Sequence, residues 1–280
     1  MSAKEKILHR MTRSEFVRRT YGTLRQIPMV GTGVRRLVHN AMPVGTKFWI
    51  RVPDGLGKGL WMYVDPRFEI GYTNGDHEPW IQELLKSELR PGDCYYDVGA
   101  HTGFFSLIAS RIVGPSGKIV TFEPDPENAA VLESHLARNR LTNVTVVEAA
   151  VWSSAGQLTF QRAAEASNRT QGQVAVTAAG SSCISVRAVC LDDLVFGEQY
   201  PVPRLMKMDV EGAEWEALHG AQRVLAEAQP KLLCEVHDGA QMGPIREFLK
   251  TLGYTAEEWK PVHPHYSDYR QLYLWATAMG

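Results

Sequence analysis

The sequence predicts an α/β fold with a mostly parallel sheet and helices on both of its faces. Three observations predict it. A buried strand, a glycine turn and a helix lie between Tyr95 and Ser110, strand–helix–strand alternation continues to Val147, and later apolar strands end in charged side chains. Ligands of such sheets bind where the carboxyl ends of the strands meet. We therefore expect a single ligand site at that edge.

The composition is that of one globular domain with an extension. The chain has 280 residues, is 44% hydrophobic and carries a formal net charge of −1, so nothing pulls it toward nucleic acid. Its 4 cysteines lack C-x-x-C spacing, which favours free thiols and a reducing cytoplasm over disulfides or a zinc site. No apolar run is long enough to span a bilayer. We expect a cytoplasmic protein, and the sequence leaves its oligomeric state open.

Residues 1–78 are predicted to form an extension, and residues 79–280 the main domain. The first 40 residues are basic, which favours a solvated helical face, with peripheral contact to an anionic membrane as the alternative. Alternation between Val44 and Tyr72 predicts a β-hairpin, and a helix is predicted from about Glu78. Four aromatic residues of this part can stack on a sugar ring or belong to the core: Trp49, Trp61, Tyr63 and Trp80.

The stretch YYDVGAHTGFFSLIAS, Tyr95 to Ser110, holds the first site candidates. Asp97 is the one charged residue of its strand, and it either faces a ligand or accepts backbone N–H bonds from the following turn. Gly99 and Gly103 allow close approach of the backbone to a ligand. Their G-x-x-x-G spacing differs from that of dinucleotide and phosphate loops. The cofactor implied has no pyrophosphate.

A second strand, Ile119 to Phe122, ends at Glu123. This acid lies 20 residues beyond Gly103, where α/β cofactor sites place a carboxylate that accepts hydrogen bonds from ribose hydroxyls. A helix-cap role is the alternative, but Asp125 and Asn128 are available for it. A helix from Pro126 to Arg140 and a third strand follow, and that strand runs from Val144 to Val147 before Glu148, Ala149 and Ala150.

The next segment predicts two antiparallel strands with a loop between them. Gln157 to Phe160 and Ile184 to Val189 alternate in polarity, whereas Ala163 to Ser182 is rich in small and polar residues and predicts a mobile loop.

Charged side chains cluster on the last two predicted parallel strands. Arg204 to Val210 carries Lys207 and Asp209, and a helix through Trp215, Leu218 and Val224 follows. Leu232 to Val236 carries Glu235 and is followed by His237. Spacing of i, i+2 places each pair on one face of its strand, so the four side chains should converge at the carboxyl edge. We predict a catalytic cluster, with two buried salt bridges as the alternative.

Five motifs in matching order resemble the FkbM family of S-adenosylmethionine-dependent O-methyltransferases: DVGAHTGFFS, FEPDPEN, VVEAAVWS, KMDVEGAEWEALHGA and LLCEVH. The resemblance implies a class I methyltransferase fold, a Rossmann-like sheet of seven strands whose antiparallel strand would be Gln271 to Ala276. It also implies S-adenosyl-L-methionine as cofactor. His101 stands where the family also has Asn.

The same resemblance assigns cofactor-binding positions. It places the methionine end at Asp97, Gly99 and Gly103, the ribose at Glu123, and the adenine near Glu148, Ala149 and Ala150. Neighbouring motif residues complete the set of cofactor-binding candidates: Ala100, Phe104, Pro124 and Asn128.

The expected reaction is methyl transfer to a hydroxyl of a small-molecule, sugar, glycolipid or polyketide-type acceptor. His237 or Asp209 would accept the proton, Glu235 would orient the imidazole, and Lys207 would stabilise the developing oxyanion.

No metal is expected; the alternative is magnesium on Asp209, Glu211 and Glu235. The acceptor atom could also be nitrogen or carbon. Two rival functions are a nicotinamide-dependent oxidoreductase of Rossmann type and a non-catalytic module that binds the adenosyl cofactor.

Overall fold

The computed structural model describes residues 47–65, 69–162, 173–174, 183–260 and 271–279. The basic arm of residues 1–40 and most of the loop predicted for Ala163 to Ser182 lie outside these ranges. By its contacts the chain divides into two compact units, Met1–Glu78 and Pro79–Gly280. No helix among the described residues has the length and apolar character needed to cross a membrane.

The first unit contains the β-hairpin that the alternating residues predict. Strands β1 (Phe48–Arg51) and β2 (Trp61–Val64) pair antiparallel and are followed by the short helix α4 (Ile70–Asn74). Trp49 and Tyr63 are opposite each other in the register, with ring centroids 5.5 Å apart, and both are half-buried. Trp80 belongs to the second unit and is buried, so it is a core residue.

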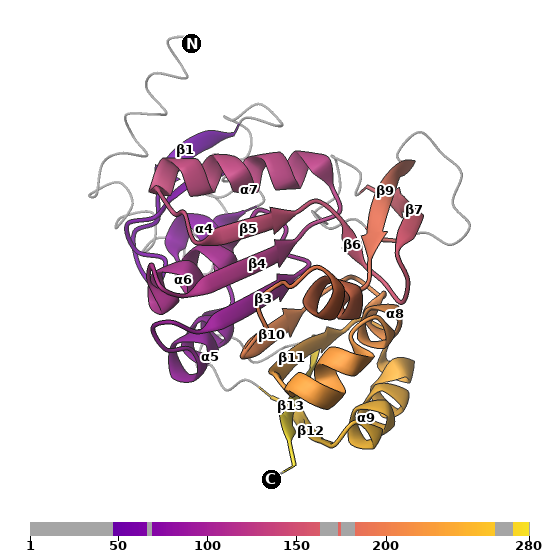
Figure 1. Cartoon of the computed structure of the whole chain (residues 1–280). Helices are drawn as coiled ribbons and strands as arrows, with labels where there is room; N and C mark the ends of the chain where they lie inside the picture. Colours follow the sequence, from indigo (N-terminus) through magenta and orange to yellow (C-terminus); the bar gives the residue numbers. More distant parts are fainter. Residues whose placement is uncertain (1–46, 66–68, 163–172, 175–182, 261–270, 280) are drawn as a thin grey trace, which may run out of the picture. The chain divides into compact units, whose positions relative to one another are not determined.

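The second unit is built on a seven-stranded sheet (Figure 1) with the order β12-β13-β11-β10-β3-β4-β5. Neighbouring strands pair in parallel from β11 to β5, whereas β13 is antiparallel to both β11 and β12. The fold prediction is confirmed in this respect, including the antiparallel strand near the C-terminus. The strands are β3 (Cys94–Val98), β4 (Lys118–Phe122), β5 (Val144–Val147), β10 (Leu205–Met208), β11 (Lys231–Val236), β12 (Tyr254–Trp259) and β13 (Leu272–Ala278).

Helices flank this sheet because its strands are apolar on both faces. The main core joins strand residues such as Met206 and Val98 to Leu218, Leu225 and Leu249 from the helical segments after β10 and β11. The helical segments of the unit are α5 (Pro79–Glu88), α6 (Phe104–Val113), α7 (Pro126–Asn139), α8 (Glu214–His219), α9 (Met242–Thr251), the π-helical turns η1 (Asp193–Gly197) and η2 (Val224–Ala228), and the 3₁₀ turn η3 (Gly239–Gln241).

A four-stranded sheet is inserted between β5 and β10, and Figure 1 shows it beside the carboxyl ends of the parallel strands. Its strands are β6 (Ala150–Val151), β7 (Gly156–Gln161), β8 (Gln173–Val174) and β9 (Cys183–Val189). The predicted antiparallel pair is confirmed as β7 and β9. Buried Ala150, Phe160 and Val186 give this sheet a small core of its own.

The single helix predicted to run through Trp215, Leu218 and Val224 is wrong. Helix α8 ends at His219, and Val224 opens the separate turn η2. Gly220 lies between them, and its backbone packs so closely on the carbonyl oxygen of Trp152 that a Cβ there would collide with it. All four cysteines are free, as expected, with Cys190 and Cys234 buried and Cys94 and Cys183 half-buried.

Candidate active site

The turn after β3 has a backbone that only glycine accommodates at two positions. Gly99 and Gly103 have φ angles of +82° and +84°. A Cβ on Gly99 would collide with the carbonyl oxygen of Asp209, and one on Gly103 with the side chain of Leu132. The turn is therefore pressed against the end of β10 on one side and against α7 on the other.

Backbone hydrogen bonds hold this turn against the end of the neighbouring strand. The N–H groups of Gly99 and Ala100 both donate to the carbonyl oxygen of Phe122 at 3.0 Å. The N–H of His101 donates to Glu123 Oε2 at 2.7 Å. His101 has a φ of +50°, in the left-handed region that Asn also tolerates.

Glu123 is a buried carboxylate at the carboxyl end of β4. Besides His101, it accepts hydrogen bonds from the N–H of Asp125 (3.0 Å) and from Asn128 Nδ2 (3.3 Å), both at Oε1. Burial raises the pKa of Glu123 to about 7, against the opposing effect of these three donors. A carboxylate has about four acceptor sites, so capacity for a ligand hydroxyl remains.

Asp97 lies inside the sheet, 1% exposed, at the end of β3. Its Oδ2 accepts a hydrogen bond from the Ser106 hydroxyl of α6 at 2.5 Å. In the register of β3 and β10, Asp97 is opposite Lys207. Burial raises the pKa of Asp97, while the charge of Lys207 and the hydrogen bond from Ser106 lower it.

Lys207 and Asp209 form a shielded ion pair at the end of β10. The Lys207 Nζ lies 2.8 Å from Asp209 Oδ2, with side-chain exposures of 4% and 14%. The ammonium also lies over the Phe105 ring of α6, 5.5 Å from its centroid. Side chains from β10 and α6 therefore meet at this edge.

His237 stands among four acids. Its Nδ1 is 2.8 Å from Glu214 Oε1, and its Nε2 is 3.2 Å from Glu211 Oε2 and 3.6 Å from both Asp209 Oδ1 and Glu235 Oε1. Burial lowers the pKa of the imidazole, but hydrogen bonds and charges of the acids raise it to about 11. This arrangement favours the imidazolium form of His237, which has no lone pair to accept a proton.

Sequence reasoning missed the part that Glu214 plays in this cluster. Glu214 is fully buried at the start of α8, and its Oε1 also accepts the N–H of Gly212 at 2.9 Å. The expected partner of the imidazole, Glu235, is more distant than Glu214. A turn at Glu211 and Gly212, with φ of +52° and +97°, directs Glu211 and Glu214 back toward the end of β10. The available signal was the density of acids in VEGAE.

A ligand atom from each of Asp209, Glu211 and His237 can be chosen so that all three lie within 4.8 Å of one another. This set can accept a divalent cation only after the His237 imidazolium loses its proton. Glu235, named with Asp209 and Glu211 in the magnesium alternative, is not in this set.

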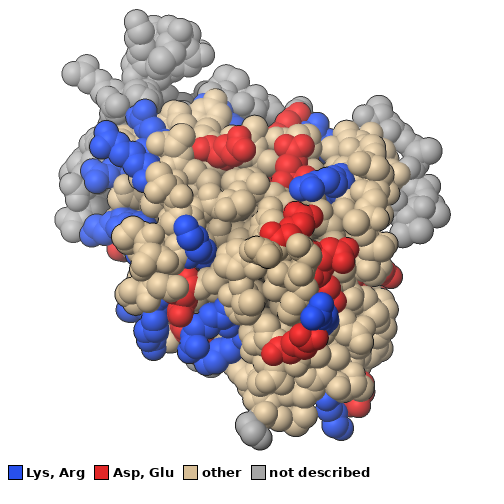
Figure 2. Space-filling model, viewed as in Figure 1, with Lys and Arg blue, Asp and Glu red and all other residues tan. Residues whose placement is uncertain are grey.

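The adenine candidates follow β5 and differ in exposure. Ala149 and Ala150 are buried, and Ala150 begins β6, whereas Glu148 is exposed. Figure 2 shows acidic side chains gathered in a band on the half of this view where, in Figure 1, β3, β4 and β5 end.

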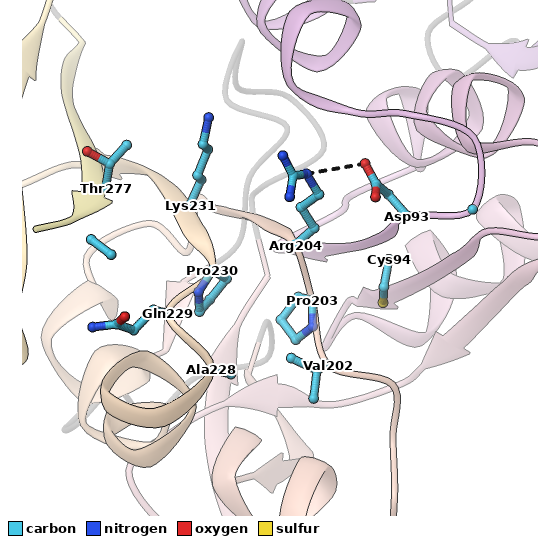
Figure 3. Close-up of a pocket in the computed structure, with 12 residues that line it drawn as sticks. Asp93, Cys94, Val202, Pro203, Arg204, Ala228, Gln229, Pro230, Lys231 and Thr277 are labelled. Carbon is cyan, nitrogen blue, oxygen red and sulfur yellow. Dashed lines mark ion pairs between the residues drawn. The ribbon is translucent and has the colours of Figure 1, made fainter. Parts of the chain in front are cut away.

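A cavity of about 590 Å³ lies elsewhere, at the amino ends of β3, β10 and β11 (Figure 3). Its lining includes Arg204, which pairs with Asp93 at 3.4 Å, and Lys231. None of the predicted site residues lines it. Since ligands of α/β sheets bind at the carboxyl ends of the strands, we do not assign the cofactor to this cavity.

The residues at the carboxyl edge fit an adenosyl cofactor. Glu123 is a buried carboxylate with remaining acceptor capacity, and the glycine turn beside it packs on the backbone of Asp209. Asp97, Gly99, Glu123 and the strand-end cluster come from adjacent strands of one sheet. The structure brings these predicted residues together, and the role of each remains a prediction.

Comparison with known proteins identifies relatives. The family model described as the methyltransferase FkbM domain matches residues 97–256. A hexuronic acid methyltransferase, AglP of Haloferax volcanii, is 28% identical over 177 residues, which cover 63% of this chain and 70% of the relative. The 31-O-demethyl-FK506 methyltransferase FkbM of Streptomyces tacrolimicus is 28% identical over 196 residues, covering 60% and 75%.

A solved structure supports the fold. The FkbM methyltransferase of Methylobacillus flagellatus KT superposes with a TM-score of 0.51 at 19% identity. The match covers 67% of this chain and 44% of that one, so the likeness extends over less than half of the solved protein.

Proposed function

Because the chain belongs to the FkbM family of methyltransferases, we propose that it methylates a hydroxyl oxygen of a small-molecule, sugar, glycolipid or polyketide-type acceptor. The family depends on S-adenosylmethionine, as the sequence motifs imply. Membership sets aside the nicotinamide oxidoreductase and the non-catalytic module. The name of one relative specifies a 31-O-demethyl compound, which supports an oxygen acceptor. The other specifies a hexuronic acid, which offers both hydroxyl and carboxyl oxygens.

One observation carries the proposal: the glycine turn touches the strand-end cluster. Gly99 packs on the carbonyl oxygen of Asp209, and Asp97 is opposite Lys207 in the sheet. A donor held by the turn is therefore next to groups that can handle the proton of an acceptor. Positioning donor and acceptor in line supplies much of the rate of such a displacement.

The proposed cofactor contacts follow the order of the strands. Asp97, Gly99, Ala100, Gly103 and Phe104 would bind the methionine part. Glu123, with Pro124 and Asn128, would bind the ribose, and the adenine would lie near Glu148, Ala149 and Ala150. When bound, S-adenosylmethionine supplies a methyl group on a positively charged sulfur.

The acceptor's proton goes to Asp209 in this proposal. With S-adenosylmethionine bound, the acceptor oxygen would take its methyl group, S-adenosylhomocysteine would leave, and the Asp209 carboxylate would take the acceptor's proton. Lys207 stabilises the developing negative charge on the oxygen. His237, already protonated, holds Glu211, Glu214 and Glu235 together and so fixes the cluster. Of the two candidate bases, His237 and Asp209, this proposal therefore chooses Asp209.

The test is transfer of a labelled methyl group from S-adenosylmethionine to panels of glycans, uronic acids and hydroxylated macrocycles. We expect one hydroxyl compound to be labelled and the label to survive as a methyl ether. Labelling that appears only on nitrogen or carbon acceptors would overturn the choice of oxygen and leave the methyltransferase assignment intact.

Asp209→Asn tests the base. General-base catalysis contributes on the order of a hundredfold, so turnover should fall by about that factor while S-adenosylhomocysteine affinity is kept. The matched control is Glu247→Gln on the exposed face of α9, which removes a negative charge remote in sequence from the cluster. Full turnover in the Asp209→Asn variant would refute this assignment.

A further inference from the structure

Arg162 links the inserted four-stranded sheet to the first turn of α7. It directly follows β7, and its Nε and Nη2 donate to Asp125 Oδ2 and Oδ1 at 2.8 and 2.6 Å. Its Nη1 lies 2.8 Å from Glu127 Oε1. A two-pronged guanidinium–carboxylate contact fixes the geometry of both partners more firmly than a single ion pair.

Asp125, which Arg162 holds in place, in turn contacts Glu123. The N–H of Asp125 donates to Glu123 Oε1 at 3.0 Å, while the N–H of His101 donates to Oε2 at 2.7 Å. An uninterrupted chain of contacts therefore runs from the inserted sheet through Asp125 to Glu123 and the glycine turn. Asp125 is 9% exposed and the Arg162 side chain 26%, so water screens the pair only partly.

The pair is not needed to form α7. Asp125 Oδ1 accepts the N–H of Glu127 at 2.8 Å and thereby caps the helix without Arg162. Burial on its own would raise the pKa of Asp125, but the hydrogen bonds and charge of Arg162 and the backbone donors of α7 lower it. The carboxylate is therefore held in its charged form, in which it binds the guanidinium most strongly.

We propose that Arg162 is a positioning residue for the cofactor: by fixing Asp125 it holds Glu123 in the geometry that binds the ribose of S-adenosylmethionine. The inference rests on the proposed ribose role of Glu123. It gives the inserted sheet a function beyond packing, because any displacement of the end of β7 is transmitted to the donor site.

The experiment measures S-adenosylhomocysteine affinity by calorimetry for Arg162→Ala, Asp125→Asn and the double variant. Asn keeps the helix cap and the backbone N–H but loses the ion pair. Each single variant should bind about tenfold more weakly, and the double variant no more weakly than either, since both remove one interaction. Arg162→Lys should recover affinity in part because it restores the charge without the fork.

The matched control is Arg187→Ala, which removes an exposed arginine from β9 of the same sheet and should bind like wild type. Steady-state kinetics separate positioning from damage to the fold. In Arg162→Ala the KM for S-adenosylmethionine should rise while kcat at saturating cofactor stays unchanged. A fall in kcat with unchanged KM would count against the inference.

Two results overturn the inference. One is an Arg162→Ala affinity equal to that of Arg187→Ala, and the other is an additive loss in the double variant. Glu123→Ala, measured in parallel, distinguishes the inference from the ribose assignment beneath it. If Glu123→Ala weakens binding and Arg162→Ala does not, only the inference fails. If Glu123→Ala binds like wild type, the ribose assignment fails and the inference fails with it.

Discussion

Position 99 requires glycine for two reasons, its positive φ and its close contact with the end of β10. Its φ of +82° is costly for any residue with a Cβ, and a Cβ at this position would also collide with the Asp209 carbonyl oxygen. Steric collision with backbone is harder to relieve than contact with a flexible side chain. The close approach of turn and strand end therefore depends on glycine.

Gly99→Ala should lower the free energy of unfolding by about 3 kcal/mol or more. Gly92→Ala is the control, because Gly92 has a similar φ of +91° but open space, with the nearest atom, Ser116 Oγ, at 3.8 Å. It should cost only about 1 kcal/mol. Urea denaturation of both variants measures the difference, and equal costs would show that crowding at Gly99 is unimportant.

Glu123 makes stability and cofactor affinity depend on pH in opposite directions. Its pKa is raised from the ordinary value of 4.5 to about 7, so between these values the folded protein keeps a proton that the unfolded chain has lost. Stability from this group therefore falls as pH rises through that window. The ionised form accepts ribose hydroxyls best, so affinity should rise over the same window.

Comparison with Glu123→Gln isolates this group from others that titrate there, such as Glu69, whose pKa burial also raises to about 7. From pH 4.5 to about 7, wild type should lose roughly 3 kcal/mol of stability relative to the variant. Its affinity for S-adenosylhomocysteine should rise with pH and level off above about pH 7. Denaturation and calorimetry give the two curves. An affinity for S-adenosylhomocysteine that does not change with pH would contradict the proposed role of Glu123 in ribose binding.

Among the elements, β13 joins β11 to β12 within the sheet, although it is the last of the described strands in the chain. It pairs with β11 on one side and β12 on the other, and it buries Tyr273, Leu274 and Ala276. Without it β11 would present an open edge and β12 would have no partner among the described strands. Exposed edges of this kind promote association between chains.

Deleting residues 271–280 should abolish cooperative unfolding and send the protein into aggregates. Deleting Gly280 alone is the control and should leave the unfolding curve unchanged. Circular dichroism during heating, together with size-exclusion chromatography, checks both variants. A soluble deletion variant with a sharp unfolding transition would show that β11 tolerates an open edge.

At the scale of the whole molecule, all candidate site residues lie in the unit Pro79–Gly280. This unit has its own sheet and main core. We expect residues 79–280 to fold alone and to bind S-adenosylhomocysteine with the affinity of the full chain. Expression of this fragment and calorimetry test it, with the full chain as reference. A fragment that folds but binds more than about tenfold more weakly would place cofactor contacts in residues 1–78.

The local residue pattern predicts the parallel strands and their alternation with helices. This is possible because buried strands are continuous apolar runs between turn residues. Strands β3, β4, β5 and β11 therefore lie where the sequence predicts them. Strand β12 reads YTAEEW, and its three exposed polar residues gave no comparable signal. Helix α9 likewise received no prediction, and it packs on β12 and β13.

The sequence by itself determined the family, the cofactor and the two strands whose ends carry the charged cluster, since these depend on residue types at fixed spacing. Only the tertiary structure decided which acids surround His237 and how Arg162 is linked to Glu123. Both depend on contacts between residues that lie far apart in the chain, 23 positions for His237 and Glu214 and 37 for Arg162 and Asp125. A pKa is set by the charges that surround a group in space, and the spacing of residues along the chain does not specify them.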